Sequence, residues 1–333
     1  MPTLDDVARL AGVSRVTASR VLNGTYPNKV SESTRERVRA AVAELNYITN
    51  VPARALRSKR SMQFGLLIPD LAFSFMPEVV QGLQDIASKM DYGCLIYLTH
   101  DQPQQEERSL STLIGRRVDG LIWMPTAHPT ERTRTLQGTL PTVTILVTPE
   151  GTSVPSVLID QEEGGYVAAK HLLELGHRRM TYMYVDHRHW QQRRVGYRRA
   201  LAEYGIADAP FYYTQVPKMD WHESLIIARQ LLKSPTRPTA VIAASDVVAL
   251  AVLRAARELG LQIPKDLSVV GFGNSSFSHQ IELPLTTVDH PKRHVGQVAM
   301  QGLAELLGGN TIENTVLPVT LVKRLSSGPP QAV

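Results

Sequence analysis

The chain has 333 residues, which is too long for one ordinary hydrophobic core and suits two or three domains. Hydrophobic residues make up 43% of it, so we expect a packed globular body, and the single cysteine, Cys94, excludes an internal disulfide framework. The chain does not open with a basic-then-apolar leader, and no apolar run is long enough to span a bilayer. We therefore expect a soluble cytoplasmic protein with no membrane contact.

The positive charge is concentrated at the start of the chain. Residues 1–60 contain eleven Lys and Arg against five Asp and Glu, a net charge of +6, whereas the whole chain has a net charge of +5. A basic module on a nearly neutral body is typical of a nucleic-acid-binding protein. A solvated basic tail is the alternative, but residues 1–60 also carry apolar residues at helical spacing, which such a tail lacks.

The first two helices of this head are indicated by their end signals. Thr3 can cap the first helix, with Asp6 as its partner in a capping box, and Gly12 can end it and allow a sharp turn. Ser14 can then cap a second helix over residues 15–22. Two short helices joined by a glycine-containing turn predict a helix-turn-helix module, whose second helix would enter the major groove.

A third helix and the exposed face of the second complete this prediction. Ser31 can cap the third helix, which carries apolar residues at helical spacing and would support the other two. The second helix would turn Arg15, Val16, Ser19 and Arg20 outward, because Ala18, Val21 and Leu22 form its apolar face.

The head resembles that of the lactose repressor/galactose repressor family. The resemblance rests on residues 3–14 and 17–24; Ala18 replaces the usual valine, and the loop 25–29 is slightly longer than usual. It implies that Arg15, Val16 and Arg20 touch bases and that Ser14, Thr17 and Asn23 mainly hold phosphates. The DNA-binding residues expected in the head are Thr3, Ser14, Arg15, Val16, Thr17, Ser19, Arg20 and Asn23.

The segment 50–57 resembles the hinge segment of the same family, which is helical only on operator DNA. The resemblance implies that Leu56 wedges between base steps in the minor groove, which costs a few kcal/mol that extra contacts offset. The alternative is an ordinary basic, proline-containing linker. The hinge residues expected to bind DNA are Asn50, Ala53, Arg54, Leu56 and Arg57.

From residue 62 onward, apolar runs alternate with helical stretches. Two successive series of strand–helix–strand units predict an α/β body of two doubly wound parallel-sheet lobes, with a ligand cleft at the carboxyl ends of the strands between them. The family resemblance also covers the body, which implies a fold like a periplasmic sugar-binding protein. The strands expected are 63–68, 93–98, 119–124, 180–185, 239–244, 267–272 and 316–322, and helices are expected at 78–90, 106–116 and around residues 171, 200, 228 and 253.

The predicted domain boundaries follow from this pattern. The helix-turn-helix head would span residues 1–48, a hinge or linker 49–60 and the effector-binding and dimerisation body 61–333. The resemblance implies one lobe, nearer the DNA, from 61–160 and 290–317, and a second lobe from 161–289 and 318–333. We call them the first and second lobe.

Several residues that follow strands are candidates for effector binding. Asp246 resembles the family's acidic motif, although Ser245 replaces the usual asparagine, and Arg193 resembles its arginine-x-x-glycine-aromatic motif. A carboxylate accepts hydrogen bonds from ligand hydroxyls, and a planar guanidinium suits carboxylates or vicinal hydroxyls. The full expected set is Phe73, Phe75, Asp160, Trp190, Arg193, Trp221, Asp246 and His290.

Plainer roles for some of these residues stay open. Asp246 can instead be a helix N-cap, or serve both roles. Phe73 and Phe75 can be core residues, and Trp221 can cover the surface of its lobe. The histidines of residues 187–190 would suggest a metal site, but we expect none, because no carboxylate or cysteine completes the set nearby.

The predicted function is a homodimeric, ligand-controlled repressor that binds a near-palindromic operator. The effector would be a sugar or sugar derivative, or alternatively a nucleoside or purine. We expect no enzyme and no cofactor, since the sequence has no dinucleotide-binding loop, P-loop or nucleophile elbow, and residues 271–273 are only a fragment of a glycine fingerprint. Helix 78–90 would contribute to the dimer interface, and the tail 326–333 has no heptad that would form a tetramer.

Overall fold

The computed structural model describes residues 2–22, 30–47, 60–126, 129–149, 151–185, 191–207, 212–216 and 220–331. The chain forms two compact units, Met1–Ser61 and Met62–Val333, and each is described by itself. The predicted hinge, with most of its boundary residues, lies outside the described residues, so the division into 1–48, 49–60 and 61–333 stays a prediction.

The head consists of three helices around a small apolar core. The helices are α1 (Leu4–Leu10), α2 (Arg15–Leu22) and α3 (Glu32–Glu44). The turn between α1 and α2 holds Gly12 at φ +62°, a left-handed conformation that glycine adopts without steric cost. The core is made of Val7, Ala8, Ala11, Ala18, Val38 and Ala41. The predicted helix-turn-helix arrangement is therefore present, with the expected bounds for α2.

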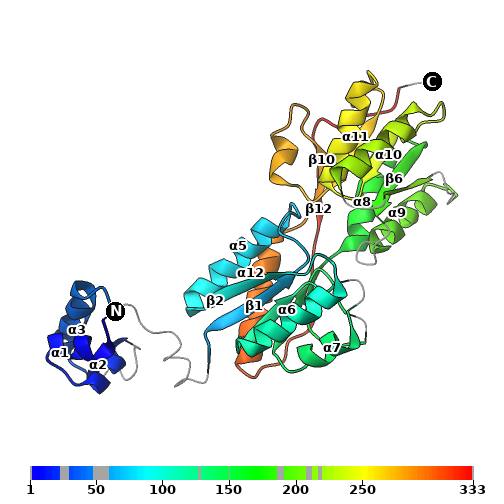
Figure 1. Ribbon diagram of the computed structural model, residues 1–333. Helices are drawn as coiled ribbons and strands as arrows, with labels where there is room; N and C mark the ends of the chain where they lie inside the picture. The colour runs from blue at the N-terminus through cyan, green and yellow to red at the C-terminus, as the bar shows by residue number, and fades with distance from the viewer. Residues whose placement is uncertain are drawn as a thin grey trace. The chain divides into compact units, whose positions relative to one another are not determined.

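The first lobe of the body is a parallel six-stranded sheet covered on both faces (Figure 1). Its strand order is β11-β5-β4-β3-β1-β2. Helices α5 and α12 pack side by side although they come from opposite ends of the body sequence. The strands are β1 (Gln63–Ile68), β2 (Gly93–Leu98), β3 (Gly120–Trp123), β4 (Thr142–Ile145), β5 (Ser156–Ile159) and β11 (Thr315–Leu317), and the helices are α5 (Met76–Ala87), α6 (Pro103–Gly115), α7 (Glu131–Gln137) and α12 (Lys292–Leu307).

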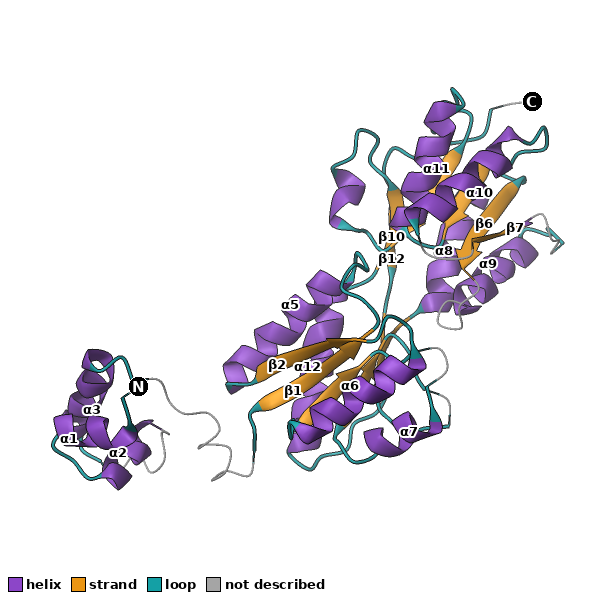
Figure 2. Ribbon diagram, viewed as in Figure 1, coloured by secondary structure: helices purple, strands orange, loops and turns teal. Residues whose placement is uncertain are grey.

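The second lobe repeats this design with strand order β12-β10-β9-β8-β6-β7. Figure 2 shows helices α8–α11 packed around its sheet. Its strands pair in parallel except at the β10–β12 edge, which is antiparallel. The strands are β6 (Met180–Val185), β7 (Tyr213–Val216), β8 (Ala240–Ala243), β9 (Ser268–Phe272), β10 (Thr286–Asp289) and β12 (Thr320–Val322), and the helices are α8 (Gln161–Glu174), α9 (Gln191–Glu203), α10 (Trp221–Lys233) and α11 (Asp246–Glu258).

Both faces of each sheet are buried, which explains the continuous apolar runs of the strands. In β1, Leu66 belongs to the cluster under α5 and α12, while Leu67 belongs to the cluster on the α6 face. In β8, Ile242 and Val241 divide in the same way between the α8–α9 face and the α10–α11 face. The predicted fold class, a helical head with two doubly wound α/β lobes, is confirmed.

Two details of the sequence prediction are wrong. The segment 316–322 is not one strand: β11 joins the sheet of the first lobe and β12 that of the second, with Pro318 between them, because the chain crosses between the lobes there and proline cannot donate a ladder hydrogen bond. Helices α5 and α6 also begin earlier than predicted. Each has a proline in its first turn, Pro77 or Pro103, where proline favours a helix start.

Candidate functional site

The capping box predicted at the start of α1 is present. The Asp6 backbone N–H donates to Thr3 Oγ1 at 3.3 Å, and the Thr3 backbone N–H donates to Asp6 Oδ2 at 2.9 Å. These hydrogen bonds to Thr3 lower the pKa of the Asp6 carboxyl. Thr3 therefore has a structural role in positioning the first helix, and its contact with DNA stays a prediction.

The start of α2 is fixed by Ser14. Its Oγ accepts a hydrogen bond from the Thr17 backbone N–H at 3.1 Å and lies 2.9 Å from Thr17 Oγ1. Ser14 thus satisfies one of the backbone donors that a helix start leaves free. Because Ser14 itself is exposed, the same N-terminal turn is open to an anion such as a phosphate.

The outward face of α2 carries the chemistry that a base-reading surface needs. Arg15 and Arg20 are exposed, Ser19 is half-buried, and Val16 is 58% exposed, which is unusual for a branched apolar side chain. Arg15 lies 3.5 Å from Asp5, but both side chains are exposed, so this ion pair holds the guanidinium only weakly. In a major groove, the guanidinium of Arg15 can donate to a guanine edge, and the exposed methyl groups of Val16 can contact a thymine methyl.

Some predicted site residues lie outside the described residues. They are Asn23 of the head, Asn50, Ala53, Arg54, Leu56 and Arg57 of the hinge, and Trp190 with the neighbouring His187 and His189. Their roles stay predictions.

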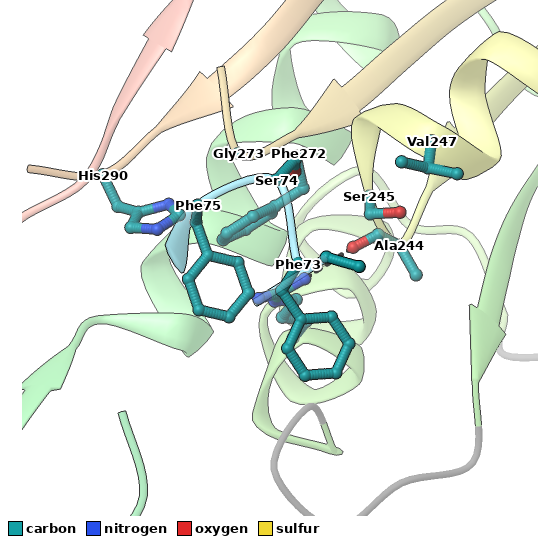
Figure 3. Close-up of a pocket in the computed structure, with 11 residues that line it drawn as sticks. Phe73, Ser74, Phe75, Ala244, Ser245, Val247, Phe272, Gly273 and His290 are labelled. Atoms are coloured by element: carbon teal, nitrogen blue, oxygen red, sulfur yellow. Dashed lines mark hydrogen bonds between the residues drawn. The ribbon is translucent and has the colours of Figure 1, made fainter. Parts of the chain in front are cut away.

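A small pocket lies between the two lobes of the body, at the carboxyl ends of strands β1, β8, β9 and β10 (Figure 3). This is where ligands bind to doubly wound sheets. Its volume is about 60 Å³. The lining residues are Ala72, Phe73, Ser74 and Phe75 from the first lobe, Arg193, Ala244, Ser245, Val247, Phe272 and Gly273 from the second, and His290 at the crossing into α12.

Arg193 supplies a buried positive charge to this pocket. It comes from α9, its Nε donates to Gln161 Oε1 at 2.5 Å, and one of its terminal nitrogens donates to the Ala244 carbonyl at 2.6 Å. Its guanidinium carbon lies 3.5 Å from the centroid of the Phe272 ring, a close cation–π stack. Burial lowers the pKa of Arg193 to about 10, so the group remains charged at neutral pH.

His290 brings an unsatisfied polar group to the same pocket. It is only 4% exposed, and neither of its ring nitrogens has a hydrogen-bond partner among the described residues. Burial, with the nearby charges of Lys292 and Arg193, lowers the pKa of His290 well below its ordinary value, so the imidazole is neutral. A neutral imidazole offers one donor and one acceptor, and leaving both unused in a buried site is costly unless a ligand or water engages them.

Phe73 and Phe75 form the aromatic wall of the first lobe. Their rings stack at a centroid distance of 5.6 Å and an interplanar angle of 7°, and Phe75 meets the His290 ring edge-on at 6.0 Å. Both are half-buried, line the pocket and pack against the main apolar core. Phe73 and Phe75 therefore belong both to the pocket wall and to the edge of the apolar core.

Asp246 has a different place from the one that the sequence suggested. It is fully buried and does not line the pocket, and its carboxylate accepts hydrogen bonds from Thr287 Oγ1 at 2.5 Å and from the Ser275 backbone N–H at 2.6 Å. It is not the N-cap of α11 either, because Ser245 has that position and accepts from the Val248 N–H. Asp246 thus holds the loop that follows β9, and this loop bounds the pocket.

Two further contacts on this loop were not predicted. Ser275 Oγ donates to Ser74 Oγ at 2.8 Å, a direct hydrogen bond between the lobes. Lys292 is buried at the start of α12, and its Nζ donates to the Gly273 carbonyl at 2.8 Å and to Asp289 Oδ1 at 2.9 Å. A lysine in the first turn of a helix opposes the helix dipole, and that unfavourable placement was the available sequence signal.

Asp160 and Trp221 are not brought to the pocket. Asp160 caps α8 by accepting from the Glu163 backbone N–H at 2.9 Å. Trp221 begins α10 and lines a separate cavity of the second lobe, of about 490 Å³, beside Leu250 and Ile281. The expectation that Trp221 shares a site with Arg193 is therefore not met in this structure.

Two features of the described part of the chain bear on other functions. Within it, no group of His, Cys, Asp and Glu residues is arranged to hold a metal ion; His187 and His189 lie outside the described residues. Among the same residues, no helix is long and apolar enough to cross a membrane.

Comparison with known proteins places both units. Residues 3–50 match the family described as bacterial regulatory proteins, lacI family, and residues 169–327 match the periplasmic binding protein-like domain. The chain is 34% identical to the HTH-type transcriptional repressor PurR of Vibrio atlanticus and 31% identical to catabolite control protein A of Priestia megaterium, over 95% of each chain in both cases. It is 33% identical to the ribose operon repressor of Haemophilus influenzae, over 98% of each chain.

A solved structure agrees with these relatives. The lac repressor dimer bound to operator and the anti-inducer ONPF matches with a TM-score of 0.86 and 29% identity, covering 98% of this chain and 99% of that one. The resemblance inferred from the sequence is confirmed, and the relatives named here are all transcription regulators.

Proposed function

Because this chain belongs to the lacI family of bacterial regulatory proteins and is a ligand-responsive DNA-binding transcription regulator, we propose that its effector binds in the pocket between the lobes and is a sugar or sugar derivative. The observation that carries the proposal is His290, a buried neutral imidazole with two unpartnered nitrogens at the pocket wall. One ligand hydroxyl can donate to the unprotonated nitrogen, and a second can accept from the protonated one. The Phe73–Phe75 wall offers an apolar surface on which a sugar ring packs.

A purine base is the second candidate, and a specific observation favours it. The pocket has aromatic walls and a cation but no free carboxylate, because the carboxylate of Asp246 is occupied by Ser275 and Thr287. A planar heteroaromatic ring needs stacking partners and a donor–acceptor pair rather than a carboxylate. One similar chain is the HTH-type transcriptional repressor PurR and another is a ribose operon repressor, so both a purine and a sugar are tested.

Binding must be coupled to a change of shape. Ligand pockets have volumes of roughly 300–1,000 Å³, whereas this pocket measures about 60 Å³. The lobes or the loop of Phe73 and Phe75 therefore have to move to admit a ligand of this size. The Ser74–Ser275 hydrogen bond joins the lobes across the pocket edge, so this contact would change when they move. A ligand that prefers one arrangement shifts the population toward it.

The DNA-binding part of the proposal rests on the head. Helix α2 would enter the major groove with Arg15 and Val16 toward the bases, and the hinge residues would follow the minor groove. Two heads of a homodimer would bind the halves of a near-palindromic operator, with α5 in the dimer interface. Such a protein acts in the cytoplasm, where bacterial DNA lies, and the regulatory role requires no catalysis, metal or cofactor.

The experiment that tests the proposal measures thermal unfolding of the full chain with D-ribose, cellobiose and hypoxanthine. A ligand at a hundred times its Kd stabilises by about 2.7 kcal/mol, which raises Tm by several degrees. The same compounds are then added to the chain on DNA selected from a random pool, and anisotropy shows whether each releases or strengthens DNA binding.

Variants assign the effect to the pocket. His290→Phe removes both nitrogens but keeps an aromatic ring, and it should abolish the shift. His279→Phe, at an exposed histidine outside the pocket lining, is the matched control and should keep it. Full retention of the shift in His290→Phe would place the effector elsewhere.

A further inference from the structure

The close packing of α8 against α9 depends on two glycines. A Cβ at Gly165 would lie 2.0 Å from the carbonyl oxygen of Arg193, and a Cβ at Gly196 would lie 1.8 Å from that of Glu162. Both atoms are backbone, so no side-chain rotation relieves either clash. The two helix backbones therefore touch, and the residue of α9 that rests on Gly165 is the one that carries the pocket guanidinium.

The neighbouring glycine of α8 has a different contact. A Cβ at Gly164 would lie 2.6 Å from Cε2 and 2.9 Å from Cζ of Phe272. The ring of Phe272 thus occupies the space that a side chain at position 164 would fill. Phe272 ends β9 and is 5% exposed, so its ring has little room to move elsewhere.

These two contacts meet in one feature of the pocket. Arg193 and Phe272 stack at 3.5 Å, and both line the pocket. We propose that the Gly164–Gly165 step of α8 positions this stack, with Gly165 fixing the backbone of Arg193 and Gly164 seating the ring of Phe272. The inference rests on the proposed function in one respect: the pocket must be the effector site for this positioning to set effector affinity.

Close helix packing alone does not explain why both Gly164 and Gly165 are glycines. In the first lobe, α5 and α12 also cross at two glycines, and a Cβ at Gly82 would lie 1.9 Å from the Arg293 carbonyl oxygen. Arg293 is exposed and pairs with Asp85 rather than with an aromatic ring. The helix crossing of the second lobe therefore has an additional glycine, Gly164, which makes room for the ring of Phe272 beneath Arg193.

The test reads the stack directly in the ligand-free full chain. Protons held over the face of an aromatic ring resonate upfield, so the side-chain N–H signals of Arg193 report the presence of the Phe272 ring. The signals are assigned by their loss in Arg193→Lys. We expect the upfield shift in the wild type and its loss in both Gly164→Ala and Gly165→Ala.

Two variants match these substitutions without touching the stack. Gly82→Ala introduces the same kind of backbone clash as Gly165→Ala, and Gly302→Ala places a Cβ 2.8 Å from a side-chain atom of Ile312, as Gly164→Ala does for Phe272. Both controls should keep the Arg193 shift even if they lower Tm. Folded Gly164→Ala and Gly165→Ala chains that keep the shift would overturn the inference.

The design also covers loss of folding. If Gly165→Ala does not fold, Gly164→Ala carries the test. If that variant does not fold either, Gly164→Ala combined with Phe272→Leu should fold, since the smaller side chain vacates the space. Failure of this rescue would refute the assignment to Phe272.

Titration of the wild type with D-ribose and hypoxanthine is a separate experiment. Unmoved Arg193 signals at saturating concentrations would count against the proposed effector site, whereas the glycine variants would still decide the positioning role.

Discussion

Replacing Asp246 should destabilise the body by an amount that can be worked out from its contacts. The carboxylate accepts two buried hydrogen bonds, one from the Ser275 backbone N–H and one from Thr287 Oγ1. Asp246→Ala leaves both donors without this acceptor, and each unsatisfied buried group costs about 1–3 kcal/mol. The expected loss of unfolding free energy is therefore roughly 2–6 kcal/mol, a large part of the roughly 5–15 kcal/mol that stabilises a typical domain.

The assay is urea unfolding of the full chain, followed by the fluorescence of its three tryptophans and by circular dichroism. Asp246→Asn is the graded variant: its amide oxygen accepts one hydrogen bond, so the loss should be about half that of the alanine variant. Asp160→Ala is the control, because it removes only a helix cap, which costs about 1 kcal/mol. Asp246→Ala unfolding at the wild-type urea midpoint would refute the reasoning and return Asp246 to the role of a ligand contact.

Three other predictions concern separate parts of the chain. Burial lowers the pKa of His171 from 6.5 to about 4, so the folded state resists the proton that the unfolded state accepts. The free energy of unfolding should therefore fall by about 3 kcal/mol as the pH drops from 6.5 to 4. His171→Gln should remove this part of the loss, which urea titrations at each pH measure. Ser74→Ala removes the hydrogen bond to Ser275, which is worth about 0.5–1.5 kcal/mol. The hypoxanthine or ribose concentration that half-saturates the DNA response should therefore change by up to about tenfold. An unchanged concentration would show that this bond does not respond to lobe motion. Exchanging Arg15 and Val16 should change the ranking of DNA sites selected from a random pool, and an unchanged ranking would contradict base reading by this face.

The head could be predicted almost completely because its signals are local. The capping box of Thr3 and Asp6, the Ser14 cap and the turn at Gly12 all act within a few residues, and the structure has each of them. The long strands of the body were predicted for a related reason, since a run of six residues that is apolar at all or all but one position indicates a buried strand. Strands β4, β5, β7 and β10 were not predicted, because each has only four residues and contains at least one serine, threonine or glutamine, so the apolar run is short.

The pocket could be predicted only in part. The sequence proposed Phe73, Phe75, Arg193 and His290 as effector contacts, and the structure places all four in one pocket lining, although the strand before His290, β10, was not predicted. It could not place Asp246, because the partners that occupy its carboxylate lie 29 and 41 residues further along the chain. Whether an acid at a strand end faces a cavity or a neighbouring loop is decided by tertiary packing, which spacing does not encode.

If the effector binds in this pocket, as we propose, the energies of these contacts indicate which groups would control the switch. The Ser74–Ser275 bond is one neutral hydrogen bond, worth about 0.5–1.5 kcal/mol. Moving a two-state equilibrium from 1:99 to 99:1 takes about 5.5 kcal/mol of differential binding. This neutral bond is therefore too weak to set the switch alone. Lys292 of the first lobe also joins the lobes, through the Gly273 carbonyl and Asp289 Oδ1, and the share that a ligand adds must come from groups that it satisfies in one arrangement only. His290 and Arg193 are the buried polar groups of the lining that can supply it, since the first has two unpartnered nitrogens and the second a fixed charge. We therefore expect an effector at the proposed site that engages neither group to bind without switching the protein.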